Sequence, residues 1–186
     1  MLVVGGLPDG SRDLVGARDR VRQALDELAP SAEAAGVTLA IEPLHPMYCS
    51  DRAVVSTLDQ ALDLSADFDP AVVAVTVDTF HIWWDPTVFD ALRRAGDEGR
   101  IATYQVCDWR TPLPADVLLS RHYPGDGVID FGPLTRVVLA SGYRRDIEVE
   151  IFNADIWSDD PRRVLARTVA GFGAAVSPHL NATVGS

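Results

Sequence analysis

The stretch VTVDTFHIWWDP, residues 75–86, begins as an alternating apolar strand and ends in polar and aromatic side chains. Its end carries Asp78 and His81, followed by two tryptophans. A buried carboxylate costs free energy unless it is paired, hydrogen-bonded or bound to a cation. We therefore expect the end of this strand to be part of a functional site.

Four stretches of the chain share one alternation pattern, with branched apolar residues on one face and small or polar residues on the other. An open sheet covered by helices on both sides would be apolar on both faces. A closed barrel explains the asymmetry better, because helices cover one face and the other points into a lumen with a polar mouth. The four stretches are Gly36–Pro43, Val72–Phe80, Ile101–Trp109 and Asp146–Phe152.

Helical patterns alternate with these strands, which predicts a parallel sheet with right-handed crossovers. The expected fold is an α/β (β/α)8 TIM-barrel type, with one partial barrel over residues 1–176 and a frayed tail at 177–186. The loop 110–130 is long enough to carry function. The remaining elements are a strand at Leu2–Gly6 and helices from Leu14 (broken by Pro30), at Thr57–Asp67, at Val88–Ala95, at Pro133–Ser141 and from Asp160.

Composition narrows the function classes. The formal charge of -11 disfavours a nucleic-acid partner, because an acidic surface repels phosphates. Two cysteines without metal-ligand spacing suit a reducing compartment. No apolar run is long enough for a membrane span, and the first residues lack the basic region of a signal peptide, so a cytoplasmic protein without a membrane partner is expected.

Four polar residues, Glu42, Asp78, Gln105 and Glu150, follow one another at about one strand–helix unit each. They stand at the carboxyl ends of consecutive strands, which converge on the catalytic mouth of a barrel. Three converging carboxylates repel one another unless a cation lies between them. Oxygen ligands suit Mg²⁺ or Mn²⁺, and the nearby His81 adds Co²⁺ or Zn²⁺.

Each residue taken alone has a simpler interpretation. A glutamate at a strand end is usually solvated or paired, and Gln105 alone is most simply a polar residue without a functional role. His81 alone is more often a hydrogen-bonded buried histidine, and the tryptophans pack in a core or rim as often as they wall a sugar site. The shared register of four strand ends favours a metal-centred site over these separate interpretations.

Five motifs in this order resemble the xylose-isomerase-like TIM barrels, over a span from the first residues to about Phe172. These are sugar phosphate isomerases and epimerases that include hydroxypyruvate isomerase, ketose 3-epimerases and inosose dehydratase, with endonuclease IV as a distant relative. The motifs are AIEPLHP, VDTFHIWWDP, YQVCDW, PGDGVIDF and EVEIF.

The resemblance implies a divalent metal, commonly Mn²⁺, Mg²⁺ or Co²⁺, held by Glu42, Asp78, Gln105 and Glu150. Gln105 matches a position that is histidine in many members and glutamine in the hydroxypyruvate-isomerase-like ones. The resemblance also implies that Glu42 and Glu150 form the acid/base pair. The implied substrate-binding residues are His81 and Arg121, and Trp83, Trp84 and Trp109 are candidates for a wall of the sugar site.

The expected substrate is a sugar or another small α-hydroxy carbonyl compound, converted by proton transfer through an enediolate. Returning the proton to the same carbon gives epimerisation, returning it to the neighbouring carbon gives isomerisation, and losing a β-hydroxyl gives dehydration. The sequence leaves these three outcomes open.

The chain has about five of the eight strand–helix units of such a barrel. We expect Leu2–Val4 to form an exposed strand edge, which another copy or a complementing chain would cover. The alternatives are a truncated, catalytically dead or merely metal-binding remnant, and an endonuclease IV-like metal hydrolase, which the negative charge disfavours.

Overall fold

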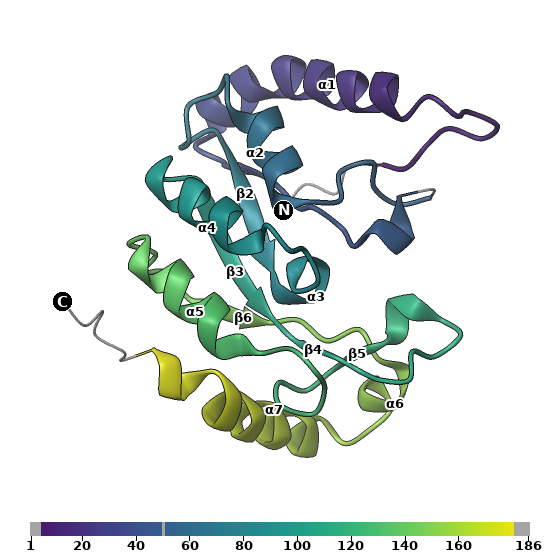
Figure 1. The fold of residues 1–186 in the computed structure, drawn as a ribbon, viewed down its shortest axis with the longest axis vertical. Coiled ribbons are helices and arrows are strands. Elements are labelled where there is room, and N and C mark those ends of the chain that lie inside the picture. The colour runs from purple at the N-terminus through teal and green to yellow at the C-terminus, as the bar shows by residue number, and fades with distance from the viewer. Residues whose placement is uncertain (1–4, 50, 181–186) are drawn as a thin grey trace.

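The computed structural model describes residues 5–49 and 51–180. Its centre is a four-stranded parallel sheet in the order β1-β2-β3-β6 (Figure 1). Spatial order follows chain order, which is the arrangement of barrel strands rather than of a doubly wound sheet. The strands are β1 (Leu39–Ile41), β2 (Val73–Asp78), β3 (Ile101–Val106) and β6 (Ile147–Val149).

The main helices follow the strands along one side of the sheet, and the short elements gather at the carboxyl ends of the strands (Figure 1). Two short strands, β4 (Asp108–Trp109) and β5 (Arg121–His122), pair antiparallel there. The α-helices are α1 (Leu14–Ala35), α2 (Leu58–Ser65), α3 (Thr79–Ile82), α4 (Val88–Asp97), α5 (Phe131–Ala140), α6 (Ala154–Trp157) and α7 (Pro161–Ala175). The 3-10 helices are η1 (Pro46–Tyr48), η2 (Val117–Leu119) and η3 (Ser177–His179).

The two faces of the sheet differ as the alternation predicts. Val73, Val75 and Val77 of β2 are fully buried in the main core, together with residues of the covering helices. On the other face Ala40, Ala74 and Ala102 form a small separate cluster, below the polar strand ends. Burial of the valine face stabilises the sheet by about 25 cal/mol per Å² of apolar surface.

Helix α1 is longer than predicted, because it runs past Pro30. The predicted break at Pro30 is wrong, because α1 continues through Pro30 as far as Ala35. Proline removes one N–H from the helix, but the buried face formed by Leu25, Ala29 and Ala32 continues past it. Tertiary packing of this face holds the helix together, and it ends at Gly36 with φ 65°, in the left-handed region that favours glycine.

Several predicted bounds also change. The four strands of the sheet are shorter than the predicted stretches, and the loop 110–130 contains η2 and β5. Residues 177–179 of the predicted tail form η3, while 181–186 lie outside the described residues. The predicted strand edge at Leu2–Val4 lies outside them as well. No helix in the described part of the chain is both long and apolar enough to cross a membrane.

Candidate active site

The predicted polar residues lie at the carboxyl ends of the four parallel strands. Glu42 follows β1, Asp78 ends β2, Gln105 lies in β3, and Glu150 follows β6. Asp78 pairs in register with Gln105, so these two side chains are direct neighbours. Glu42 and Asp78 are buried at 3% and 1% exposure, whereas the Glu150 side chain keeps 24%. The site therefore has a buried side and a side open to solvent.

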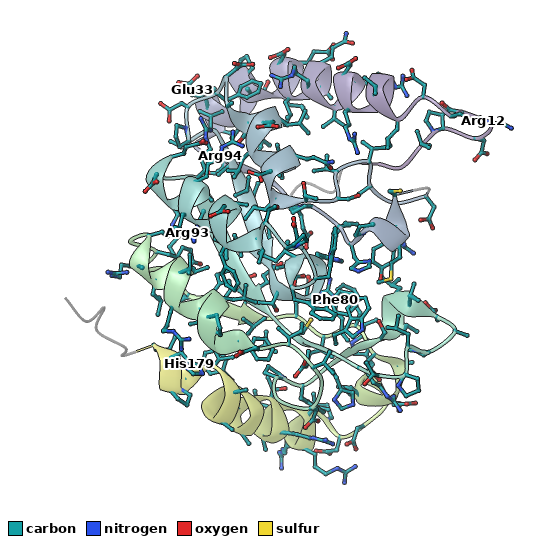
Figure 2. The ribbon with its side chains drawn as sticks, in the orientation of Figure 1. Arg12, Glu33, Phe80, Arg93, Arg94 and His179 are labelled. Carbon is teal, nitrogen blue, oxygen red and sulfur yellow. The ribbon has the colours of Figure 1, made fainter. Side chains whose placement is uncertain are left out.

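Arg121, on β5, contacts three residues around the site, namely Asp78 of β2, Glu150 after β6 and Phe80 of α3. Its Nη1 donates to Asp78 Oδ2 at 2.7 Å and to Glu150 Oε2 at 2.8 Å. Its guanidinium also lies 4.9 Å from the ring centroid of Phe80, a residue in the interior of the molecule (Figure 2). Burial disfavours the charged form of Arg121, but Asp78 and Glu150 more than offset this and raise its pKa.

The two oxygens of Asp78 have different partners. Oδ1 accepts a hydrogen bond from the Phe80 backbone N–H at 2.9 Å and caps α3. Oδ2 faces the site, where it meets Arg121 at 2.7 Å. The cap fixes the rotamer of Asp78, so that one defined oxygen points at the other site residues.

Two buried acceptors of the site have no hydrogen-bond partner among the described residues, namely Glu42 Oε1 and Gln105 Oε1. Burial and the nearby Asp78 carboxylate raise the pKa of Glu42 to about 8. The Gln105 amide is oriented by its Nε2, which donates to Glu148 Oε2 at 2.8 Å. Unpartnered buried acceptors beside two carboxylates are what a site for a divalent cation requires.

His81 is buried at 2% exposure, and its burial lowers its pKa to about 3, so the ring is neutral. Its Nδ1 accepts the His45 backbone N–H at 3.0 Å, which leaves the ring proton on Nε2. Nε2 lies 3.9 Å from both Glu42 Oε1 and Asp78 Oδ2. The His81 ring therefore presents an N–H donor to the site.

A group of three side chains has the spacing of a metal site. One ligand atom each from Glu42, Asp78 and His81 lies within 4.8 Å of the others. This group shares two residues with the predicted ligand set, which also contains Gln105 and Glu150. His81 could coordinate an ion only after Nε2 loses its proton, because Nδ1 accepts the His45 N–H.

A cavity of about 380 Å³ opens beside these residues. The predicted substrate contacts His81 and Arg121 line it, but no tryptophan is among its lining residues. Trp83 and Trp109 lie in an aromatic cluster instead, with ring centroids 5.4 Å apart, and the centroid of Trp109 is 4.8 Å from that of His45. The aromatic lining comes from Tyr48 and Phe152.

Sequence reasoning missed these two aromatic residues. The signal for Phe152 was available, because it follows Glu150 by two positions and so shares its face in an extended chain. Tyr48 lies in η1, a short element outside the strand alternation, so only the structure could place it.

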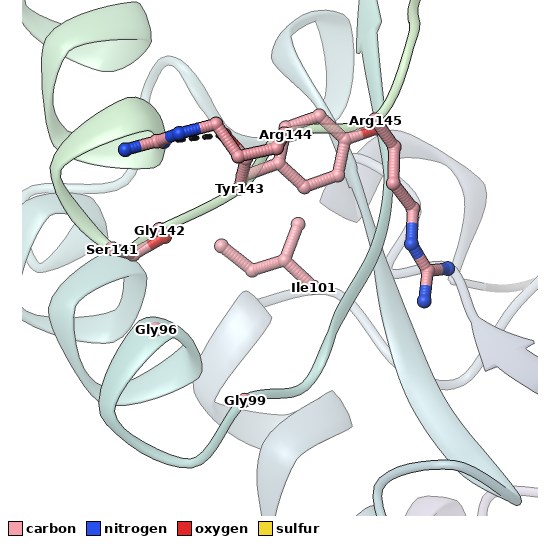
Figure 3. Close-up of a pocket in the computed structure, with 8 residues that line it drawn as sticks. All are labelled: Gly96, Gly99, Ile101, Ser141, Gly142, Tyr143, Arg144 and Arg145. Atoms are coloured by element: carbon pink, nitrogen blue, oxygen red, sulfur yellow. Dashed lines mark hydrogen bonds between the residues drawn. The ribbon is translucent and has the colours of Figure 1, made fainter.

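A second cavity, of about 280 Å³, lies at the opposite end of β3, beside Ile101 and Tyr143 (Figure 3). None of its lining residues carries a carboxylate, an imidazole or a thiol. Arg144 is directed at backbone carbonyl groups, those of Leu139 and Tyr143. The Tyr143 hydroxyl, which also lines it, already accepts from the Tyr104 N–H and donates to the Asp146 carbonyl.

Asp108 holds the loop that follows Arg121. Its carboxylate is fully buried and accepts backbone N–H groups from Trp109, Gly125, Gly127 and Ile129 at 2.8–3.0 Å. A side chain on Gly127 would meet Asp108 Oδ1 at 2.4 Å, so the close approach requires glycine. The carboxylate thereby fixes the turn of the PGDG motif and the strand pair that carries Arg121.

We expect Asp108→Ala to lower the free energy of unfolding by about 2–4 kcal/mol, because several buried N–H groups lose a charged acceptor. Chemical denaturation of the purified chain measures the change. Asp126→Ala is the matched control, since this partly exposed carboxylate of the same loop pairs with Arg167 at the surface and should contribute less than about 1 kcal/mol. Equal losses in the two variants would contradict the assigned role of Asp108.

The sequence matches the family described as "Xylose isomerase-like TIM barrel" over residues 1–172. The chain belongs to this family. The α/β TIM-barrel type of fold predicted from strand alternation is thereby confirmed.

Among the relatives of this chain are an isomerase and an epimerase. An inosose isomerase from Bacillus velezensis is 28% identical over 138 residues, which are 73% of this chain and 47% of the relative. An L-ribulose 3-epimerase from Mesorhizobium japonicum is 27% identical over 169 residues, 89% of this chain and 52% of the relative. The relatives also include a dehydratase. This chain spans about half the length of the two named relatives.

A solved structure of protein SMc04130 from Sinorhizobium meliloti 1021 superimposes with a TM-score of 0.90 and 44% sequence identity. The match covers 94% of this chain and 63% of that protein. The fold of that protein and the fold of this chain are thus closely similar over the matched residues.

Proposed function

We propose that this chain belongs to a divalent-metal-dependent isomerase or epimerase that acts on an α-hydroxy carbonyl sugar or sugar phosphate. The observation that carries the proposal is the convergence of Glu42, Asp78 and Glu150 at neighbouring strand ends, beside the amide of Gln105. The isomerase and epimerase among the relatives support the reaction class.

The residues present fit a divalent ion. Glu42, Asp78, Gln105 and Glu150 would hold it, because they offer oxygen donors and two of these oxygens lack a partner in the described chain. Mn²⁺, Mg²⁺ and Co²⁺ suit this donor set, and Zn²⁺ is an alternative. When bound, such an ion supplies Lewis acidity, which stabilises negative charge on a neighbouring oxygen.

The remaining chemistry belongs to the side chains. Glu42 and Glu150 come directly after the first and last strands of the four, so a substrate between them has one carboxylate on each side. One removes a carbon-bound proton, and the same or the other returns it. His81 donates its Nε2–H to a substrate oxygen, as the tautomer set by His45 requires.

Solvent deuterium incorporation tests the reaction class. Keto sugars incubated in D₂O with the chain and Mn²⁺ should gain deuterium at the carbon next to the carbonyl, and samples without Mn²⁺ should not. Mass spectrometry measures the exchange and separates it from loss of water, which would indicate a dehydratase instead. A chain that binds Mn²⁺ without any exchange would support the alternative of a metal-binding remnant.

We also propose that a second copy or a complementing chain covers the open strand edges of the sheet. Within the described residues β1 pairs only with β2, and β6 only with β3, whereas a closed barrel leaves no edge. If a second copy covers them, analytical ultracentrifugation of the purified chain should show a species larger than the monomer. A monomer at all concentrations would contradict the second copy and leave the complementing chain.

A further inference from the structure

We propose that Arg121 is the resident cation of this site, and that a divalent ion binds only when the Arg121 guanidinium leaves the carboxylates. The inference rests on the proposed function, because it concerns the same metal site. It assigns to Arg121 a role in metal affinity that is separate from any contact with substrate.

The guanidinium has the position and the contacts of a bound cation. Arg121 is 4% exposed, and its Nη1 lies 2.7 Å from Asp78 Oδ2 and 2.8 Å from Glu150 Oε2. It therefore bridges carboxylates from two strands, as an ion would. Among the described residues, no other arginine forms an ion pair with Glu42, Asp78 or Glu150.

The contact at Asp78 makes the two cations compete. Because Oδ1 of Asp78 is held by the Phe80 N–H, Oδ2 is the oxygen that faces the site. The same oxygen already accepts from Arg121 Nη1. An ion at Oδ2 would meet N–H groups that point at it and a full positive charge, in a buried setting where screening is weak.

The contact between the Arg121 guanidinium and His81 is unfavourable, unlike its contacts with the carboxylates. Arg121 Nη2 lies 3.0 Å from His81 Nε2. Since Nδ1 accepts from His45, Nε2 carries the proton, so two donors face each other there. This donor–donor contact weakens the present position of Arg121 relative to one outside the carboxylates.

The structure also offers room for the displaced side chain. Arg121 lines the cavity of about 380 Å³, together with Tyr48 and Phe152. A rotation of the side chain toward this cavity would keep the guanidinium near aromatic faces. The carboxylate oxygens of Asp78 and Glu150 would then be free for an ion.

Titration calorimetry with Mn²⁺ tests the competition. Arg121→Met keeps the length and apolar stem of the side chain and removes its charge, so we expect Mn²⁺ to bind at least ten-fold more tightly than to the wild-type chain. Arg52→Met is the matched control, because Arg52 lines the same cavity but forms no ion pair with the three carboxylates. Its Mn²⁺ affinity should change less than three-fold.

The outcomes separate the inference from the proposed function. If wild type and Arg121→Met bind Mn²⁺ equally well, or if the variant binds more weakly, the competition is refuted while the metal site stands. If neither binds Mn²⁺, the proposed function fails as well. Should Arg121→Met not fold, a crystal structure of the wild-type chain with Mn²⁺ decides the matter, since Arg121 must then have left Asp78 Oδ2. A retained Arg121–Asp78 hydrogen bond in that structure would overturn the inference.

Discussion

Glu150→Gln is expected to reduce Mn²⁺-dependent deuterium exchange by about 100-fold to 10,000-fold, the usual contribution of a general base or acid. The amide keeps the shape of Glu150 and can still accept from Arg121, but it cannot take up a proton at neutral pH. Circular dichroism should show an unchanged fold, because the Glu150 side chain is 24% exposed.

Glu148→Gln is the control for this experiment. Glu148 lies two residues earlier and accepts a hydrogen bond from the Gln105 amide, which glutamine can replace. Exchange in this variant should stay within a few-fold of the wild-type rate. Wild-type exchange in Glu150→Gln would remove Glu150 from the mechanism and leave Glu42 as the only candidate of the predicted pair.

The second large effect is expected for Asp78→Asn, which should weaken Mn²⁺ binding by at least 100-fold, or about 2.8 kcal/mol. Asparagine keeps the Oδ1 acceptor that caps α3 through the Phe80 N–H, so the change removes charge rather than local structure. Calorimetric titration of both chains with Mn²⁺ gives the two dissociation constants directly.

Asp51→Asn provides the comparison, because Asp51 lines the same cavity but is exposed. The loss of its charge should change the Mn²⁺ affinity by less than three-fold, since solvent screens this exposed carboxylate both from an ion and from Arg121. An equal loss of affinity in the two variants would mean that only the total negative charge of the cavity matters, and Asp78 would no longer count as a ligand.

Most of what the sequence could predict came from the alternation of side chains between the two faces of each strand. The period of two placed the valines of β2 in the core, and it placed Glu42, Asp78 and Gln105 at one end of the sheet. These positions depend only on the local geometry of extended chain and on the parallel order of the strands. The sequence could therefore predict that these residues lie at one end of the sheet, because both rules are general.

Side-chain partners across loops could not be predicted in this way. The Arg121 bridge depends on how the loop 110–130 folds back, and that fold depends on the buried Asp108 carboxylate. Likewise, the aromatic cluster around Trp109 forms through tertiary contacts that no periodicity encodes. Pro30 failed as a helix breaker for the same reason, since packing outweighed a local preference.

The agreement between chain order and spatial order in the sheet has a consequence for divergence within this family. The segment after each strand supplies lining residues of the cavity, as Tyr48 does after β1, His81 after β2, Arg121 after β3 and Phe152 after β6. A change of length or composition in one such segment can therefore alter which molecule is accepted while the polar residues at the strand ends keep their positions. Selectivity can evolve one segment at a time on a constant reactive centre.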